Sequence, residues 1–246
     1  IKSAREIELM REAGKRLAHV HQELEAMIAP GISTWEIDAK GEKLIRDCGC
    51  IPNFLHYNGY PASICVSVND EVVHGIPRKD RYLKEGDIVS LDAGLIYKGY
   101  HSDAARTHAV GKVSTEAQKL MDVTKQSFFE GIKMAKEGQH LHDVSRAIEE
   151  YVTPYGYGIV RDLVGHGIGT ALHEDPQIPN YAQKRRGVRL QAGMTLAIEP
   201  MINAGTWQVR FLRDGWTVVT KDGSLSAHYE NTILVTDGEP EILTLY

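Results

Sequence analysis

Asp87–Val110, DIVSLDAGLIYKGYHSDAARTHAV, is the stretch that decides the fold. Its two arms are rich in apolar and β-branched residues and flank a short loop with a glycine, which is typical of a β-hairpin. A turn centred on Tyr97-Lys98 would set Asp92 directly opposite Asp103, with Cβ atoms about 4.5–5.5 Å apart. Two like charges at that spacing are destabilising unless a cation lies between them, although two solvated strand aspartates are the alternative.

Three further side chains that can bind a metal lie in segments with strand character: His166, Glu199 and Glu230. Glycines on both sides of His166 allow backbone and ligand to come close. In one pocket with Asp92 and Asp103, these groups would bury four carboxylates and one imidazole, and buried charges must be paired or bind metal. We therefore expect a pair of divalent ions at these five residues.

The second half of the chain repeats the acidic pattern of the first. Segment 84–92 aligns with 191–199 at a shift of 107 residues, and segment 101–103 resembles 228–230 at a shift of 127. Both alignments match an acidic residue with an acidic residue. The sequence thus indicates an internal duplication, with two carboxylates from each half facing each other; the alternative is chance similarity between short apolar strands.

Periodicity outside the hairpin gives the same order of elements twice. Capping residues and apolar residues at helical spacing predict four helices, beginning at Ser3, Ser33, Thr115 (as the cap, with Gln118) and Leu141. Strands are expected at 63–68, in the hairpin and over much of 159–246. The predicted class is α+β: a curved, mostly antiparallel sheet with helices on one side. We expect one catalytic domain, residues 1–246, with halves at roughly 1–112 and 113–246.

Composition excludes several classes of protein. A chain of 246 residues can bury a sizeable core, and its net charge of −5 is spread without a basic face for nucleic acid or a membrane surface. No apolar run reaches transmembrane length. Cys48, Cys50 and Cys65 form no CxxC pair, so a reducing cytoplasm is expected.

Two histidines stand out beside His166. His74 and His173 each precede a short turn-forming segment, and a loop histidine bonded to backbone is as compatible with the residues as a functional one. The remaining histidines considered are interpreted as solvated: His19, His21, His56, His108, His140 and His142.

Five segments resemble type I methionine aminopeptidases: NGYPASICVSVNDEVVHGIP (58–77), GDIVSLDAGLIYKGYHSDAARTHAVG (86–111), VGHGIGTALHEDP (164–176), MTLAIEPMI (194–202) and DGWTVVTKDGSLSAHYENTILVT (214–236). The resemblance implies the pita-bread fold, whose internal pseudo-twofold agrees with the duplication. It also implies an enzyme that removes the initiator methionine from nascent proteins with a small second residue. The chain resembles the short bacterial form, without a zinc-binding extension.

The resemblance implies a role for each metal ligand. Asp103 and Glu230 would bridge two ions, Asp92 would complete one site, and His166 with Glu199 would complete the other. Oxygen-rich ligation with one imidazole suits Mn, Fe or Co, while Zn or Ni stay open.

The same resemblance implies the catalytic and substrate-binding residues. Glu199 would shuttle the proton of the attacking water, His173 would stabilise the oxyanion, and His74 would bond the scissile amide. The lining of the methionine pocket would be Tyr57, Tyr60, Cys65, Leu172 and Trp216. Asn58, at the pocket edge, replaces a histidine of some relatives.

Two other functions stay open on the sequence alone. A proline-specific aminopeptidase or dipeptidase shares the fold but usually carries a large N-terminal domain. A metal-free binding protein on this scaffold would normally have lost ligands, whereas here all five are present. The family suggests a monomer that acts on nascent chains, with a ribosome contact as an open question.

Overall fold

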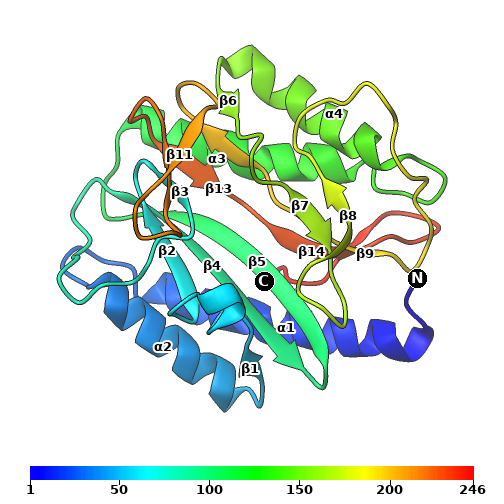
Figure 1. Ribbon diagram of the computed structural model, residues 1–246, viewed down its shortest axis with the longest axis horizontal. Helices are drawn as coiled ribbons and strands as arrows, with labels where there is room; N and C mark the ends of the chain where they lie inside the picture. The colour runs from blue at the N-terminus through cyan, green and yellow to red at the C-terminus, as the bar shows by residue number, and fades with distance from the viewer.

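The predicted hairpin forms the centre of the molecule. In the computed structural model, which describes residues 1–246, β4 (Ile88–Tyr97) and β5 (Tyr100–Ala109) pair antiparallel along their whole length. Figure 1 shows both strands running across the middle of the molecule. They place both of the predicted aspartate ligands.

The predicted register of this hairpin is wrong by two residues. Lys98 and Gly99 form the turn with φ angles of 46° and 88°, as a two-residue hairpin turn requires. Asp92 therefore lies opposite Ala105, and Asp103 lies opposite Gly94. Because side chains alternate with period two, the aspartates still share a face as diagonal neighbours.

Four helices begin close to the predicted caps. Ser3 and Ser33 each form a complete capping box with a glutamate three residues later. The third helix is capped by Ser114, which accepts a hydrogen bond from Ala117 N, so the prediction of Thr115 as cap is wrong by one residue. The helices are α1 (Ala4–Ala26), α2 (Thr34–Asp47), α3 (Thr115–Ile132) and α4 (Leu141–Val152), with 3-10 turns η1 (Tyr57–Gly59) and η2 (Thr153–Tyr155).

The strands form four small antiparallel sheets, and the two larger ones contain the hairpin β4–β5 and the strand pair β9 (Thr195–Ile198) and β14 (Asn231–Leu234). The first sheet joins β4 and β5 to β1 (Ile51–Pro52) and β2 (Ile64–Val68). The second has the order β15 (Glu241–Ile242), β14, β9, β7 (Gly165–Gly167) and β8 (Glu174–Ile178). Two further sheets have three strands each. One has the order β13 (Ser226–His228), β10 (Met201–Asn203) and β6 (Gly158–Ile159). The other has the order β11 (Val209–Phe211), β12 (Val218–Thr220) and β3 (Glu71–Val73).

The two main sheets meet along β5. Ala105 and Glu230 exchange backbone hydrogen bonds of 3.2 and 3.0 Å. Nearby, Asp103 N donates to Thr232 Oγ1 at 3.1 Å, and the same hydroxyl donates to Asp103 O at 2.8 Å. The acidic positions of the two halves are therefore fixed to one another by backbone contacts.

The duplication is visible in the hydrogen bonds as well as in the sequence. Gly31 N donates to Leu83 O at 2.7 Å, and Gly138 N donates to Leu190 O at 3.0 Å. Each residue of the second bond lies 107 positions after its counterpart in the first. Gly31 and Gly138 also share a left-handed backbone, with φ angles of 94° and 89°.

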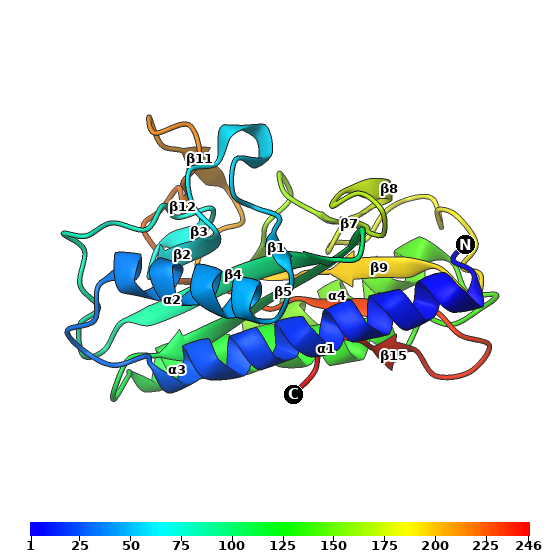
Figure 2. The same cartoon turned by 90° about the horizontal axis from the view of Figure 1, so that it is seen from below.

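The helices cover one side of the sheets, and the opposite side is left open. One large apolar cluster packs α1 and α2 against β2 and β4, and another packs α3 and α4 against β9, β10 and β14. Figure 2 shows α1 beneath the strands, with β3, β11 and β12 above them. No helix has the length and apolar character needed to span a membrane.

Candidate active site

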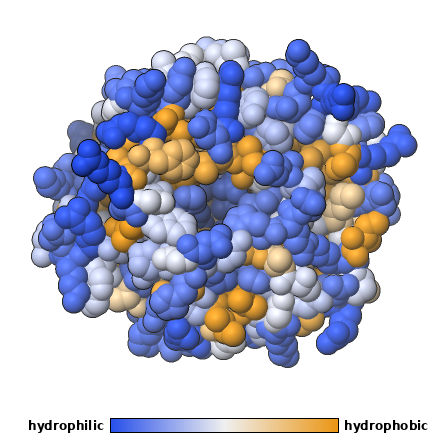
Figure 3. Space-filling view, in the orientation of Figure 1, coloured by the Kyte–Doolittle hydropathy of each residue, from blue (hydrophilic) through white to orange (hydrophobic).

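A cavity opens on the face away from the helices. Figure 3 shows this face hollowed near its centre. The cavity measures about 230 Å³ and combines an apolar side with a charged floor. Its lining is Phe54, Tyr57, Asn58, Tyr60, Cys65, Val73, His74, Asp92, Asp103, Leu163, Val164, His166, Leu172, His173, Glu199, Met201 and Trp216.

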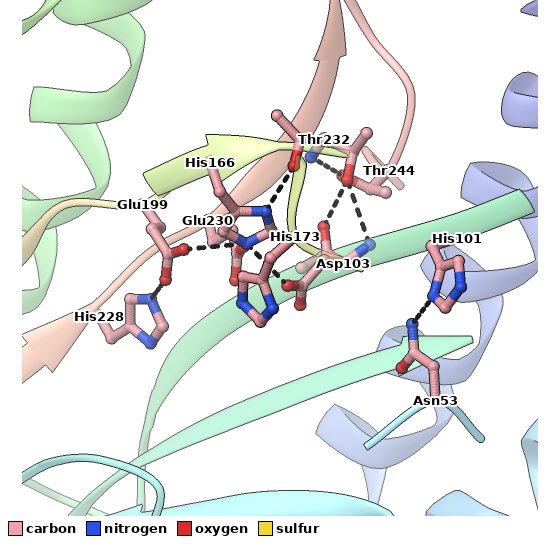
Figure 4. Close-up of polar contacts among 12 residues, drawn as sticks. Asn53, His101, Asp103, His166, His173, Glu199, His228, Glu230, Thr232 and Thr244 are labelled. Carbon is pink, nitrogen blue, oxygen red and sulfur yellow. Dashed lines mark hydrogen bonds and ion pairs between the residues drawn. The ribbon is translucent and has the colours of Figure 1, made fainter. Parts of the chain in front are cut away.

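The five predicted metal ligands lie together at this floor, in what we call the acidic cage (Asp92, Asp103, His166, Glu199 and Glu230). Asp92 comes from β4, Asp103 from β5 and His166 from β7, whereas Glu199 and Glu230 directly follow β9 and precede β14. Glu230 is 0% exposed, and the other members are largely buried. Figure 4 shows the side chains of Asp103, His166, Glu199 and Glu230 converging on one region.

His166 lies among three carboxylates. Its Nε2 is 3.4 Å from Asp103 Oδ2, 3.3 Å from Glu199 Oε1 and 3.9 Å from Glu230 Oε1. Burial works to lower the pKa of His166, but the carboxylates of Asp103 and Glu199 outweigh it and raise that pKa to about 10. In the absence of a metal ion, a proton on this imidazole therefore offsets part of the negative charge of the cage.

The remaining negative charge has no partner in the protein. Burial, followed by repulsion from neighbouring carboxylates, raises the pKa values of Asp92 and Glu230 well above their ordinary range. Asp92 Oδ1, Asp103 Oδ1 and both carboxylate oxygens of Glu230 are buried without a hydrogen-bond donor. Unpaired carboxylate oxygens at this depth are costly, and they form the donor set that divalent cations prefer. The residues present thus fit divalent metal binding.

His228 is a member of the site that the sequence analysis missed. Its Nε2 lies 3.1 Å from Glu199 Oε2, so Glu199 stands between two imidazoles (Figure 4). Burial acts to raise the pKa of Glu199, but bonds to His166 and His228 lower it to about 2. The one available signal was position: His228 precedes Glu230 by two residues, a spacing that places side chains of an extended chain on the same side.

Two sets of residues bring three ligand atoms close together, with all atoms of a set within 4.8 Å of one another. One set is Asp92, His228 and Glu230, and the other is Asp103, His166 and Glu230. Glu230 belongs to both sets and is the most deeply buried member of the cage. Either set could hold a divalent cation, and the predicted ligand Glu199 belongs to neither.

His74 and His173 both line the cavity beside the cage. His173 Nδ1 lies 2.8 Å from the hydroxyl of Tyr57, and its ring centroid is 4.2 Å from that of His166. His74 has a left-handed backbone, with φ of 60°, and its ring meets Trp216 edge to face at 6.3 Å. Burial is the main cause of a lowered pKa at both histidines, so neutral imidazoles face the cavity.

The five residues expected around the methionine side chain all line the apolar side of the cavity. Tyr60 donates its hydroxyl to Gly75 O at 2.8 Å and meets Trp216 edge to face at 5.2 Å. Cys65 is buried, and burial raises its thiol pKa, which fits a packing role. Five further apolar residues line the cavity and were not predicted as part of it from the sequence: Phe54, Val73, Leu163, Val164 and Met201.

The interpretation of His21 as solvated is wrong. His21 is 0% exposed on α1, and its Nε2 lies 2.7 Å from Ala104 O. Its helical position among apolar residues on the buried face of α1 was the available signal. The same interpretation is wrong for His108, whose side chain is only 12% exposed and whose Nε2 is buried. His140 and His142 are half-buried, while His19 and His56 are exposed.

Comparisons with known proteins agree with the fold and the site. The model of metallopeptidase family M24 matches residues 8–237. The methionine aminopeptidase of Clostridium acetobutylicum is 54% identical over 245 residues, covering 100% of this chain and 98% of that protein. The crystal structure of methionine aminopeptidase from Thermotoga maritima superposes with a TM-score of 0.98 at 48% identity, covering 100% and 99% of the two chains.

Proline-specific relatives are more distant. The prolidase of Pyrococcus furiosus superposes with a TM-score of 0.77 at 23% identity, and this chain spans 65% of its length. That likeness is one of fold alone. The full-length family match, the close relatives and the cage of buried carboxylates together lead to one conclusion: the chain belongs to metallopeptidase family M24.

Proposed function

We propose that this protein is a metal-dependent aminopeptidase that removes the N-terminal methionine of polypeptides. One observation carries the proposal: unpaired buried carboxylates and two neutral histidines lie beside the apolar side of a cavity of about 230 Å³. Relatives at about half identity over the whole chain are methionine aminopeptidases, which supplies the substrate class.

The cage would hold two divalent ions. Asp103 and Glu230 are proposed as the shared ligands, with Asp92 at one ion and His166 with Glu199 at the other. Mn, Fe or Co are the expected ions, and Zn or Ni remain alternatives, because oxygen ligands dominate. When bound, such ions polarise the peptide carbonyl and lower the pKa of water.

The side chains around the cage would divide the remaining work. Glu199 is ionised and is proposed to accept the proton of the attacking water and to pass it to the leaving amine. His173 is proposed to donate a hydrogen bond to the carbonyl oxygen as negative charge develops on it. His74, as a neutral imidazole, would hydrogen-bond the nitrogen of the scissile amide.

Selectivity would arise at the apolar side of the cavity. An unbranched, polarizable methionine side chain suits the lining of Tyr57, Tyr60, Cys65, Leu172 and Trp216. The free α-amino group of the substrate would bind near Asp92, which restricts cleavage to the first peptide bond. We further propose a preference for a small second residue, with Asn58 adjusting polarity at the pocket edge.

The cellular setting follows from the same proposal. The substrates would be the N-termini of nascent polypeptides in the cytoplasm, and the three free cysteines suit a reducing compartment. The enzyme would act as a monomer with one catalytic domain made of two like halves, 1–112 and 113–246. A ribosome contact would place it near its substrates.

A peptide panel with each candidate metal tests the proposal. Met-Ala-Ser should be cleaved to methionine and Ala-Ser by protein loaded with Mn, Fe or Co, and Ala-Pro should remain intact. Turnover of Ala-Pro alone would assign a proline-specific peptidase instead. Elemental analysis of protein purified without chelator should find divalent metal, and its absence would favour a binding protein.

A further inference from the structure

His228 occupies an unusual place between two cavities. Its Nε2 lies 3.1 Å from Glu199 Oε2, yet its side chain does not line the cavity proposed for the substrate. Instead it lines a second cavity of about 390 Å³, together with Thr107, His108 and Tyr229. The contact between His228 and Glu199 is thus part of the wall that separates the two. One of the ring nitrogens of His228 also lies within 4.8 Å of ligand atoms of Asp92 and Glu230, so a direct effect on a metal ion is the alternative that the experiment must separate.

The backbone that carries the imidazole is fixed, and the side chain is buried. His228 is 1% exposed at the end of β13, where Met201 is its partner in β10. Thr107 Oγ1 accepts a hydrogen bond from His228 N at 2.9 Å and donates one to His228 O at 2.8 Å. A buried side chain on a backbone fixed in this way is suited to orient a partner.

Glu199 needs an external group to fix its orientation. Asn180 Nδ2 bonds only the backbone oxygen of Glu199, at 3.2 Å. In the carboxylate of Glu199, Oε1 lies 3.3 Å from His166 Nε2, and Oε2 has His228 Nε2 as its hydrogen-bond partner. Without His228 the carboxylate could rotate and turn its Oε1 away from the cage.

We infer that His228 is a positioning residue that holds the Glu199 carboxylate in its metal-binding and proton-accepting orientation. The role in proton transfer rests on the proposed function, whereas the effect on metal binding does not. Groups that hydrogen-bond a metal ligand fix its direction, and their loss typically weakens metal affinity or activity by about 10- to 100-fold.

A double-mutant cycle with Mn²⁺ tests the inference by calorimetry. His228→Leu should weaken Mn²⁺ binding by about 10- to 100-fold, and His228→Gln, which keeps an N–H donor, should restore most of it. In a Glu199→Gln background, His228→Leu should change the affinity by less than about twofold, because the carboxylate that it orients is gone.

Kinetics on Met-Ala-Ser provide the second readout. His228→Leu should lower kcat and leave KM nearly unchanged, since His228 does not line the substrate cavity. His108→Leu is the matched control: it lines the same second cavity but does not contact the cage, so it should leave Mn²⁺ affinity and kcat unchanged.

Two results would overturn the inference. If His228→Leu weakens Mn²⁺ binding equally in both backgrounds, His228 acts directly on the metal and not through Glu199. If Mn²⁺ affinity is unchanged while the melting temperature falls, its role is structural. A parent enzyme that binds Mn²⁺ but does not cleave Met-Ala-Ser would refute the proposed function and leave the binding cycle valid.

Discussion

Replacing Glu230 by glutamine should stabilise the metal-free protein at neutral pH while abolishing its stabilisation by metal. Glu230 is fully buried, neither of its oxygens has a partner, and ligand atoms of Asp92 and Asp103 lie within 4.8 Å of its carboxylate. Two like charges 4.8 Å apart repel by about 3.5 kcal/mol at an effective dielectric constant of about 20. Such repulsion favours protonation, which limits the actual cost.

We expect Glu230→Gln to raise the free energy of unfolding of the metal-free protein by about 2 kcal/mol, within the usual range for a buried unpaired polar group. For a chain of this size that corresponds to a rise of about 4–8 °C in melting temperature. Addition of Mn²⁺ should raise the melting temperature of the parent and leave that of the variant nearly unchanged.

The pH dependence fixes the sign of this prediction. In the folded chain, burial and then neighbouring carboxylates raise the pKa of Glu230 above its ordinary value of 4.5. The stability that this group contributes is complete below that value and is lost as pH rises through the folded pKa. The advantage of Glu230→Gln should therefore grow as pH rises above 4.5 and vanish below it.

Glu174→Gln is the matched control with the opposite pH dependence. Glu174 pairs with Lys2 at 2.7 Å, and its pKa is lowered because this ion pair and backbone donors outweigh burial. Its amide variant should lower the melting temperature at pH 7, with a difference that fades as pH falls. Thermal melts in chelator, from pH 4 to 8, compare both variants with the parent. A metal-free Glu230→Gln protein that melts below the parent at all pH values would refute the reasoning.

Three further predictions concern metal binding and catalysis. Asp103→Asn should reduce bound metal and lose nearly all peptidase activity, as measured by elemental analysis and Met-Ala-Ser turnover; full activity would contradict the proposed site. Mn²⁺ affinity should rise with pH between pH 6 and 8, by up to about tenfold per pH unit for each proton that binding displaces. One such proton is that of His166, held with a pKa of about 10, and the raised pKa values of Asp92 and Glu230 add protons there. Calorimetry in buffers of different ionisation enthalpy counts the released protons, and a pH-independent affinity would contradict the prediction. Tyr57→Phe removes the 2.8 Å contact with His173 Nδ1 and should lower kcat by about three- to tenfold; an unchanged kcat would show that Tyr57 does not orient this imidazole.

The sequence predicted the elements better than the contacts between them. Capping serines marked the first two helices because the cap and its glutamate are three residues apart and both are local. The hairpin was located correctly, but its register was not, because the turn could centre on either side of Lys98. The left-handed φ angles of Lys98 and Gly99 select the two-residue turn, and they depend on the folded backbone.

The cage illustrates a different limit of sequence reasoning. Its acidic members could be collected because buried carboxylates without partners are chemically unusual wherever they occur. His228 could not, because histidine is common in packed positions and its role depends on contacts that form only in the folded chain: 3.1 Å to Glu199, and within 4.8 Å of Asp92 and Glu230. His21 is a similar case: it lies on the buried face of α1, and its contact with Ala104 O of β5 forms only when the helix packs on the sheet.

The duplication explains why neither half could form the cage alone. Each half places two carboxylates on one sheet face, Asp92 with Asp103 and Glu199 with Glu230, and each set by itself is a repulsive pair. The backbone exchange between Ala105 and Glu230 joins the two sheets at the point where these pairs approach each other. Bringing four carboxylates together in this way costs stability at neutral pH, and bound cations would relieve that cost, so metal affinity and the stability of the interface between the halves should rise and fall together.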